Sequence, residues 1–506
     1  MWEKRLPEFV LPSDTTPWWK KPHLLKLNTI ISGLLLFSGT VGYDGSLMNG
    51  LQSLAQWREF MDQPAGAWLG FINAIQFVGV MITFPIQAWA ANRFGRKPPI
   101  FIGYVFLLAG AGIQTGARNQ TMFIIARFLI GVASAWFTVA VILIAEISYP
   151  THRSKLSAMY QCQYYLGSSL AAWLSFGCRN TDSSWAWRIP SLMQVGIPLC
   201  ALPLALLAPE SPLKDRHQEA FQMLVKHHAG GDQDSPLVAS EMQEITQSIA
   251  NEREAQNSTK WTDMIKTHGN RRRLFISATL GTFAQWNGVG IVSYYLALIL
   301  NTIGITSVTD QLMINGFLQI WNLLLAIVGA MLVDRFGRRP LFLLSTCVML
   351  MSYIVITGLS GGFATTNSSS VGISVIPFLF IYYGGYDIGF TPLLLAYPAE
   401  IWQYSLRAKG VAITATCTYI ALIFNTLVNP IALDAIQWKY YIVYIALLVL
   451  ILVVVYFTYP ETRRHSLEEI ALIFDGDEAS EVAAATIEEE KVDKEVDHVE
   501  VAPRHA

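Results

Sequence analysis

The chain has few charged residues and few cysteines. Only 14% of its 506 residues are charged, against about 25% in an ordinary soluble domain. Its five cysteines are scattered without a CxxC or His-rich pattern, which excludes a disulfide framework and a zinc module. The sequence contains no phosphate-binding loop and no metal-ligand cluster, so we expect neither an ATP-driven pump nor an enzyme, and no metal or cofactor. With a net charge of −2 it has no basic field, so no nucleic-acid partner is expected.

Long apolar runs dominate what is present, since 53% of the residues are hydrophobic. A hydrocarbon core of about 30 Å needs roughly 20 apolar residues in a helix that rises 1.5 Å per residue. Twelve such runs occur between residues 28 and 459, and the third and fifth, 99–117 and 155–177, are the least apolar. The sequence therefore predicts an all-α membrane protein with 12 transmembrane helices in a lipid bilayer.

Basic residues are distributed unevenly between alternate loops. If the N-terminus is cytoplasmic, the inner segments hold 29 Lys and Arg, the outer segments hold five, and Arg127 lies inside a span. Cytoplasmic loops carry the excess of basic residues in membrane proteins. We therefore predict that the N- and C-termini are both cytoplasmic.

The sequence also contains an internal repeat. Three ordered segments recur 242 to 254 residues later: Asn92–Lys97 as Asp334–Arg339, Glu146–Arg153 as Glu400–Arg407, and Pro209–Ser211 as Pro460–Thr462. All lie at predicted cytoplasmic span ends, which indicates two six-helix halves with the substrate site between them. The predicted domains are an N-terminal cytoplasmic segment (1–27), a six-helix bundle (28–208), a cytoplasmic linker with short helices (209–272), a second six-helix bundle (273–459) and a cytoplasmic acidic tail (460–506).

The repeated charged residues are predicted to form a cytoplasmic gate. Arg and Glu at helix ends can pair while that side is closed and separate when it opens. Partly exposed pairs contribute about 0–1 kcal/mol each, so several of them bias a conformational equilibrium without locking it. The alternative is that the basic residues only follow the charge asymmetry, a rule that acids do not serve. The predicted gate residues are Arg93, Glu146, Arg153, Glu210, Asp334, Arg335, Glu400, Arg407 and Glu461.

Charged residues inside the spans are candidates for coupling. Asp44 lies in the middle of the first span, where a charge costs at least about 2.5–3.5 kcal/mol. We predict that it faces Arg127 and binds a proton when that contact is lost, which couples proton and substrate movement. The alternative is a fixed ion pair that orients two helices. Asp387 is a second acid, which we interpret as a second titrating group or a substrate contact, with a helix cap or a water-facing acid as the alternative.

Several motifs resemble those of the sugar porter family of the major facilitator superfamily. They are Gly42–Asp44, Arg127–Phe128, Trp187–Pro190, Pro209–Pro212, Gln285–Tyr295, Asp334–Arg339 and Pro460–Arg463, and the match covers about residues 25–474. Within the family, Gln285–Gly288, Gln319–Asn322 and Asn425–Leu433 resemble the fungal lactose and cellodextrin permease branch. The resemblance implies the major facilitator fold, a monomer in the fungal plasma membrane, and sugar transport by alternating access with a proton as the coupling ion.

Uncharged amides and aromatic rings are the side chains that suit a sugar, because they bond adjacent hydroxyls and cover C–H surfaces. The resemblance implies that Gln161, Gln285 and Asn322 bind sugar. The full set of predicted substrate contacts is Gln161, Gln285, Trp286, Asn287, Tyr294, Asn322 and Asn425. For each amide the alternative is a hydrogen bond between helices.

The chain also departs from the family pattern. Asn92 replaces the first acid of the loop motif, Ala284 one of two glutamines, Gly290 an Asn, and Leu395 a Trp. From the resemblance we predict a transporter for a small-molecule sugar, a disaccharide or hexose, in symport with protons, and the departures leave alternatives for the substrate. The alternatives are a porter of a polyol, an organic acid or a secondary metabolite, and a transport-dead nutrient receptor, which the short tail of 47 residues disfavours.

Overall fold

The computed structural model describes residues 17–212, 217–463, 465 and 467–476. Within these ranges the chain is almost entirely helical and contains no strand. The start of the predicted N-terminal segment, residues 1–16, and most of the predicted acidic tail, residues 477–506, lie outside the described residues.

Ten helical segments of the described chain are long and apolar enough to cross a bilayer. One of them, Tyr404–Thr458, consists of two helices, α19 (Tyr404–Ile436) and α20 (Tyr440–Thr458), joined by one 3-10 turn. The less apolar α7 (Arg153–Cys178) has the length of a further span, as its sequence predicts. The fold class of twelve spans is thereby confirmed, whereas the orientation of the termini stays a prediction.

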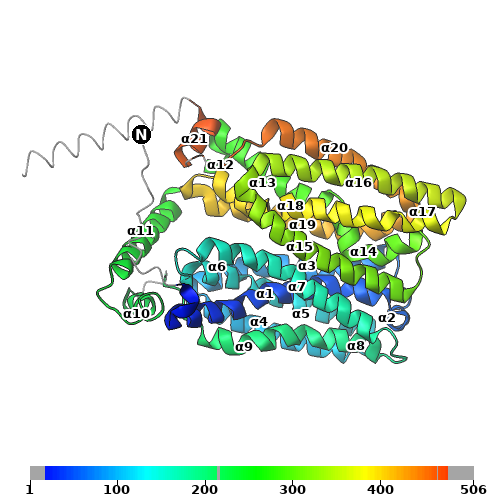
Figure 1. The fold of residues 1–506 in the computed structure, drawn as a ribbon, viewed down its shortest axis with the longest axis horizontal. Helices are drawn as coiled ribbons and strands as arrows, with labels where there is room; N and C mark the ends of the chain where they lie inside the picture. The colour runs from blue at the N-terminus through cyan, green and yellow to red at the C-terminus, as the bar shows by residue number, and fades with distance from the viewer. Residues whose placement is uncertain (1–16, 213–216, 464, 466, 477–506) are drawn as a thin grey trace, which may run out of the picture.

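The spans form two halves of six. The first half contains α1 (Pro22–Ser53), α3 (Gly66–Phe94), α4 (Lys97–Thr115), α5 (Gln120–Phe137) continued by α6 (Val139–Ile147), α7, and α8 (Trp185–Leu192) continued by α9 (Gly196–Leu207). The second half contains α13 (His268–Trp286) continued by α14 (Val289–Thr302), α15 (Val308–Phe336), α16 (Arg338–Thr366), α17 (Ser369–Ile373) continued by α18 (Val375–Ile401), α19 and α20. Figure 1 shows the halves as two layers that lie side by side along their length.

The shorter helices lie at the two ends of the bundle. Linker helices α10 (His217–His227), α11 (Pro236–Ser258) and α12 (Asp263–Lys266) gather at one end with α21 (Leu467–Asp475) (Figure 1). We call this end the linker face. The opposite face carries α2 (Ala55–Phe60) and α17. By the charge asymmetry, the linker face is the predicted cytoplasmic side.

Glycines shape two of the turns at the linker face. Gly95 between α3 and α4 has φ 100°, and Gly337 between α15 and α16 has φ 94°. Both values lie in the region that only glycine adopts readily. A Cβ atom would lie 2.9 Å from the Glu210 carboxyl group at Gly95, and 2.7 Å from the Glu461 carboxyl group at Gly337. The repeated motif thus needs glycine for conformation and for space.

Several side-chain contacts join the two halves toward the opposite face. The Asn49 side chain of α1 donates to the Ser293 carbonyl at 2.5 Å and accepts from the Leu296 N–H at 3.1 Å, both in α14. These groups flank Tyr295, whose backbone is non-helical. Arg179, after α7, donates to Thr309 of α15 at 3.2 Å. The structure is therefore closed at the opposite face.

Candidate functional site

Asp44 and Arg127 lie together inside the first half. Asp44 is 0% exposed and Arg127 is 1% exposed. The Arg127 Nη1 donates to the main-chain carbonyl of Asp44 at 3.5 Å, and Ser134 donates to the Asp44 Oδ2 at 3.3 Å. The Asp44 Oδ1 and the Arg127 Nε have no hydrogen-bond partner among the residues that the structure describes. Sequence reasoning placed these two residues together, but the expected ion pair between their charged groups is not formed in this conformation.

Close helix approaches bring these side chains together. A Cβ atom on Gly42 of α1 would contact the Tyr164 carbonyl oxygen of α7, and one on Gly131 of α5 would contact the Gln76 carbonyl oxygen of α3. Small residues permit such close packing of transmembrane helices. Ser134, one helical turn beyond Ile130, was not predicted, because a serine in a span has no distinctive sequence signal.

Three of the predicted amides keep polar atoms available. The Gln285 side chain is 9% exposed and no hydrogen bond to its amide group is found among the described residues. Asn322 is fully buried, and neither its Nδ2 nor its Oδ1 has a hydrogen-bond partner in the described part of the chain. Gln161 is exposed, one helical turn from Tyr165, which contacts the second half. Buried amides without partners are the groups that a polar ligand or water would satisfy.

The other predicted contacts are already bonded within the protein. Asn287 accepts from the Val289 N–H at 3.0 Å and so closes the turn between α13 and α14. Asn425 donates to the Gln285 carbonyl at 2.8 Å and accepts from Tyr444 at 2.9 Å. In this structure both amides tie helices together.

The two predicted aromatic contacts lie at different places. Trp286 donates to the Ala421 carbonyl at 3.3 Å and packs 5.4 Å from the ring of Phe424, which is 52% exposed. Its ring therefore lies toward the outside of the second half. Tyr294 lies between the halves, 5.3 Å from the ring of Phe77 in α3.

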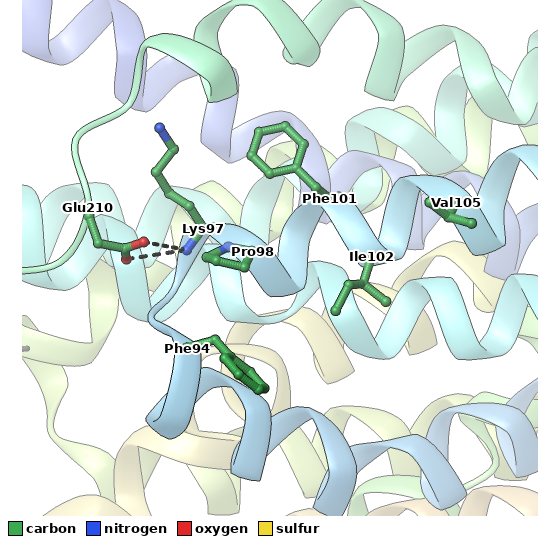
Figure 2. A pocket seen from close by; sticks show the side chains of 7 residues that line it. All are labelled: Phe94, Lys97, Pro98, Phe101, Ile102, Val105 and Glu210. Atoms are coloured by element: carbon green, nitrogen blue, oxygen red, sulfur yellow. Dashed lines mark hydrogen bonds between the residues drawn. The ribbon is translucent and has the colours of Figure 1, made fainter.

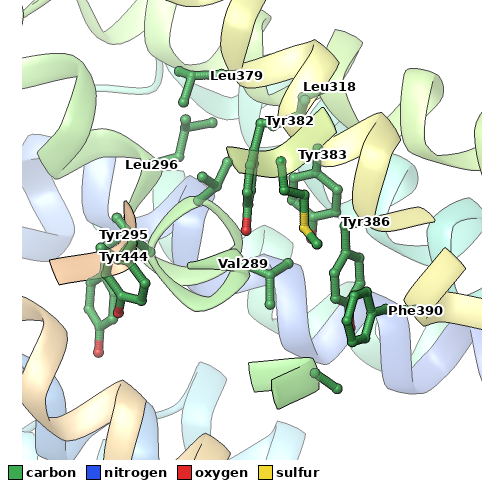
Figure 3. Close-up of a cluster of buried hydrophobic side chains, with 14 of the residues drawn as sticks. Val289, Tyr295, Leu296, Leu318, Leu379, Tyr382, Tyr383, Tyr386, Phe390 and Tyr444 are labelled. Carbon is green, nitrogen blue, oxygen red and sulfur yellow. The ribbon is translucent and has the colours of Figure 1, made fainter. Parts of the chain in front are cut away.

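A cluster of tyrosines supports the broken helix α13–α14 (Figure 3). Tyr382 of α18 donates to the Asn287 carbonyl at 3.2 Å, and Tyr295 donates to the Thr426 carbonyl of α19 at 2.6 Å. Tyr383 and Ser293 are hydrogen-bonded at 2.6 Å. Tyr382, and Tyr353 at the Gly288 carbonyl, satisfy carbonyls that the break in the helix leaves free, whereas the other two bonds fix α14 to α19 and α18.

The repeated charged motif forms the same arrangement in each half. In the first half, Arg96 pairs with Glu146 at 3.1 Å, and Glu210 accepts from the Arg96 main-chain N–H at 2.7 Å. In the second half, Arg338 pairs with Glu400 at 2.8 Å, and Glu461 accepts from the Arg338 N–H at 2.9 Å. The acids cap the start of α4 and α16, where backbone N–H groups are free.

The structure corrects which arginines take part. Arg93 and Arg335 are exposed, and the arginines that pair with Glu146 and Glu400 are Arg96 and Arg338, which follow the turn glycines. Both pairs join helices within one half. Their role as a gate stays a prediction.

The remaining gate residues have other surroundings. Arg153 pairs with Glu244 of the linker helix α11 at 3.5 Å. The Arg407 guanidinium lies 5.7 Å from the ring of Tyr404. The side chain of Asp334 lies outside the described residues.

A groove of about 760 Å³ lies beside this motif, at the start of α4 (Figure 2). Its lining includes Phe94, Val105 and Glu210, and Figure 2 shows the Glu210 carboxylate bonded to the Lys97 main-chain N–H. Phe94 is 50% exposed and Val105 is 67% exposed. Exposed apolar side chains on a membrane helix face lipid, and no predicted substrate contact lines the groove, so we do not assign it to transport.

Comparisons with known proteins identify the family of the chain. A sequence profile for the family described as "Sugar (and other) transporter" matches residues 30–474. The chain is 28% identical to MFS-type transporter oryC of Aspergillus oryzae, over 85% of this chain and 82% of that one. It is also 28% identical to MFS glucose transporter mfs1 of Aspergillus flavus, over 87% of this chain and 88% of that one.

The fold matches solved transporters. The xylose transporter XylE from E. coli in an inward open conformation superposes with a TM-score of 0.73 at 22% identity, covering 88% of this chain and 100% of that one. These relatives are transporters, not enzymes. The family resemblance predicted from the motifs is confirmed, and the protein belongs to the sugar transporter family, the sugar porters of the major facilitator superfamily.

Proposed function

We propose that the protein is a symporter that carries a neutral sugar, a hexose or a disaccharide, together with protons by alternating access. The observation that carries the proposal is the Asp44 carboxyl group, which is buried and has no cation bonded to it. A buried carboxylate whose oxygens bond no cation is destabilised, and the Arg127 guanidinium bonds the main chain instead, so we infer that this conformation favours the neutral, protonated acid.

Arg127 supplies the second state of the coupling reaction. Its guanidinium donates to the main-chain carbonyl of Asp44, the residue of α1 that carries the carboxyl group. A rotation that brings the guanidinium to the carboxylate favours the ionised acid and expels the proton. The carboxyl group thus exchanges a proton for an internal cation as the halves change their arrangement, and a substrate that favours one arrangement is coupled to the proton.

The free amides support a neutral polar substrate. Gln285 and Asn322 offer donors and acceptors without charge, which suits hydroxyl groups and gives no counter-charge for an anion. Relatives support the same class, since one is named as a glucose transporter of Aspergillus flavus and another as a high-affinity glucose transporter of Kluyveromyces lactis. We further propose that the protein acts as a monomer in the plasma membrane with the linker face in the cytoplasm.

One observation favours a second candidate, a porter of a less polar molecule such as a secondary metabolite. The family's Asn on α14 is Gly290 here, and a Cβ atom at Gly290 would lie 2.5 Å from the Asn425 Nδ2. Asn425 fills that space, but its amide is bonded to Gln285 and Tyr444. The site therefore offers fewer free hydrogen-bonding groups than the family pattern.

The test is uptake of radiolabelled compounds in a yeast strain without hexose transporters. We expect wild-type cells to accumulate a sugar, and an uncoupler to abolish the accumulation. Asp44→Asn should lose accumulation against a gradient but keep exchange of sugar for sugar. The control is Asp434→Asn, an exposed acid of α19, which should transport normally.

Two results would overturn the proposal. Accumulation that remains pH-dependent in Asp44→Asn would remove Asp44 from coupling. Uptake of organic acids or secondary metabolites, with no uptake across a panel of hexoses and disaccharides, would favour the second candidate.

A further inference from the structure

A second buried carboxyl group lies at the contact between the two halves. Asp387 of α18 is 0% exposed. Its Oδ1 accepts a hydrogen bond from the Tyr165 hydroxyl of α7 at 2.5 Å and another from Thr391 at 2.9 Å. Its Oδ2 is buried and has no hydrogen-bond partner within the described ranges. The bond to Tyr165 connects the second half to the first.

No cation balances this acid in the part of the chain that the structure describes. The titratable side chains around it are Tyr165 and Cys162 from α7, and Tyr383 and Tyr386 from its own helix. All are neutral at physiological pH unless strongly perturbed. The helices packed behind it, α15 and α16, approach its neighbourhood with glycine and serine.

The distribution of donors fits a neutral carboxylic acid. A carboxylate has two equivalent acceptor oxygens, whereas a neutral acid has one carbonyl oxygen and one oxygen that carries the hydrogen. Both donors lie on Oδ1 and none lies on Oδ2. We therefore assign Oδ1 as the carbonyl oxygen and Oδ2 as the oxygen that carries the proton, with an O–H that meets no acceptor among the described residues. An ionised group here would be buried without a counter-charge.

Asp387 is fixed to the second half, whereas its tyrosine partner is not. A Cβ atom on Gly329 of α15 would lie 2.6 Å from the Asp387 carbonyl oxygen, and Ser345 of α16 donates to the Gly385 carbonyl at 2.6 Å. Tyr165 belongs to α7 of the first half. Of the two hydrogen bonds on the Asp387 Oδ1, only the one from Tyr165 crosses between the halves, so it is the one that changes when the halves move relative to each other.

We propose that Asp387 is a proton-binding site between the halves, additional to Asp44. It keeps its proton while Tyr165 contacts it. When the halves separate there and water enters, the O–H bond of Oδ2 breaks, the proton passes to water, and a hydrated carboxylate remains. The role in coupling rests on the proposed symport, but the protonation itself does not.

Infrared absorption of the full-length protein in lipid nanodiscs tests the protonation. A neutral carboxyl group has a C=O band that a carboxylate lacks. We expect the band at neutral pH to lose one component in Asp387→Asn and to keep it in Asp434→Asn, whose carboxyl group is exposed. Tyr165→Phe should keep that component and move it to higher wavenumber, because the carbonyl oxygen loses a hydrogen bond.

Each variant can overturn the assignment. A band in Asp387→Asn identical to that of the wild type would show that Asp387 is ionised. An unshifted component in Tyr165→Phe would show that the Tyr165 hydroxyl does not bond the carbonyl oxygen of protonated Asp387. Tyr165→Phe keeps the acid in place, so it tests the proposal even if Asp387→Asn fails to fold.

Reversal potentials in proteoliposomes test the role in coupling. Sugar and proton gradients are set against each other until net flux stops, which gives the number of protons moved per sugar. We expect Asp387→Asn to move one proton fewer per sugar than the wild type, and an unchanged ratio would remove Asp387 from coupling. If the wild type moves no protons with sugar, the proposed symport fails, while the infrared result still decides whether Asp387 is protonated.

Discussion

At the scale of single residues, what an amide does depends on the bonds its atoms already make. Gln285 and Asn425 are neighbours on two spans, and both have amide side chains. Asn425 is bonded to the Gln285 carbonyl and to Tyr444, whereas the Gln285 amide has no partner among the described residues. The first arrangement stabilises the bundle, and the second leaves a group for substrate.

Substitution should separate these roles. We expect Gln285→Ala to raise the KM for the transported sugar about tenfold, since one lost hydrogen bond costs about 1–1.5 kcal/mol. Its surface expression and thermal midpoint should stay near those of the wild type. Asn425→Ala is the matched variant and should lower the thermal midpoint in detergent instead. Normal kinetics in Gln285→Ala would remove it from the site.

Sequence reasoning found some of the site residues and missed others for physical reasons. Asp44 and Arg127 are predictable because a charge inside a span is costly, so charged residues there face the bundle interior and usually have a function. Ser134 and Tyr165 are not, because hydroxyl side chains are common in spans and matter only through a partner on another helix. Arg96 was missed because the turn at Gly95 decides which arginine faces Glu146.

At the scale of helices, the packing of α1 against α7 depends on glycine. A Cβ atom on Gly167 of α7 would contact the Gly39 carbonyl oxygen of α1, which is backbone and cannot rotate away. Gly177, in the same helix, has no atom within 4 Å of the corresponding position. The two glycines therefore differ in what lies opposite them, since Gly167 is buried in the middle of α7 and Gly177 is exposed near its end.

This pair predicts a difference in stability. Gly167→Ala should force the helices apart and lower the free energy of unfolding by about 1–3 kcal/mol. Gly177→Ala should be neutral or slightly stabilising, because alanine favours helix. Thermal unfolding of both purified variants in the same detergent measures the effect. Equal midpoints would show that the close contact does not limit packing.

The linker helices meet the first half through a cluster of histidines. His228 lies 2.8 Å from Glu241 of α11, and its Nε2 lies 3.1 Å from the Ile147 carbonyl at the end of α6. Its neighbour His227 is buried at the end of α10. Burial, with Lys226 nearby, lowers the pKa of His227 from 6.5 to about 4. The docked linker therefore holds His227 neutral.

This shift makes the docking of α10 depend on pH. Between pH 6.5 and 4 the undocked helix binds a proton that the docked helix does not, so docking is strongest above pH 6.5 and weakens as the pH falls. Hydrogen exchange of residues 217–227, corrected for intrinsic rates, should show protection that decreases over this range. His227→Gln should lose less protection than the wild type. Identical pH profiles would show that His227 does not control docking.

At the scale of the whole molecule, the sequence predicts the twelve spans and the two halves but not which face is closed. The spans follow from hydrophobicity, and the halves follow from a repeat that is visible in the sequence. Closure depends on side-chain contacts between segments more than 240 residues apart, such as Asn49 with Ser293 and Gln52 with Tyr294. No local pattern in the sequence indicates such contacts.

The Asn49 amide should therefore set the balance between the two open states. It bonds a donor and an acceptor at the break in α14, so Asn49→Ala leaves buried backbone groups unsatisfied only while the opposite face is closed. We expect the equilibrium to shift at least about tenfold toward the state open at that face, since each such group costs about 1–3 kcal/mol. Electron-resonance distances between spin labels at Asp182 and Ser370, exposed residues of the two halves, should increase. Gln114→Ala, which removes a buried amide bonded only within the first half, should leave them unchanged. Equal distance distributions in Asn49→Ala and the wild type would mean that the packing of α1 against α14, and not this amide, keeps the face closed.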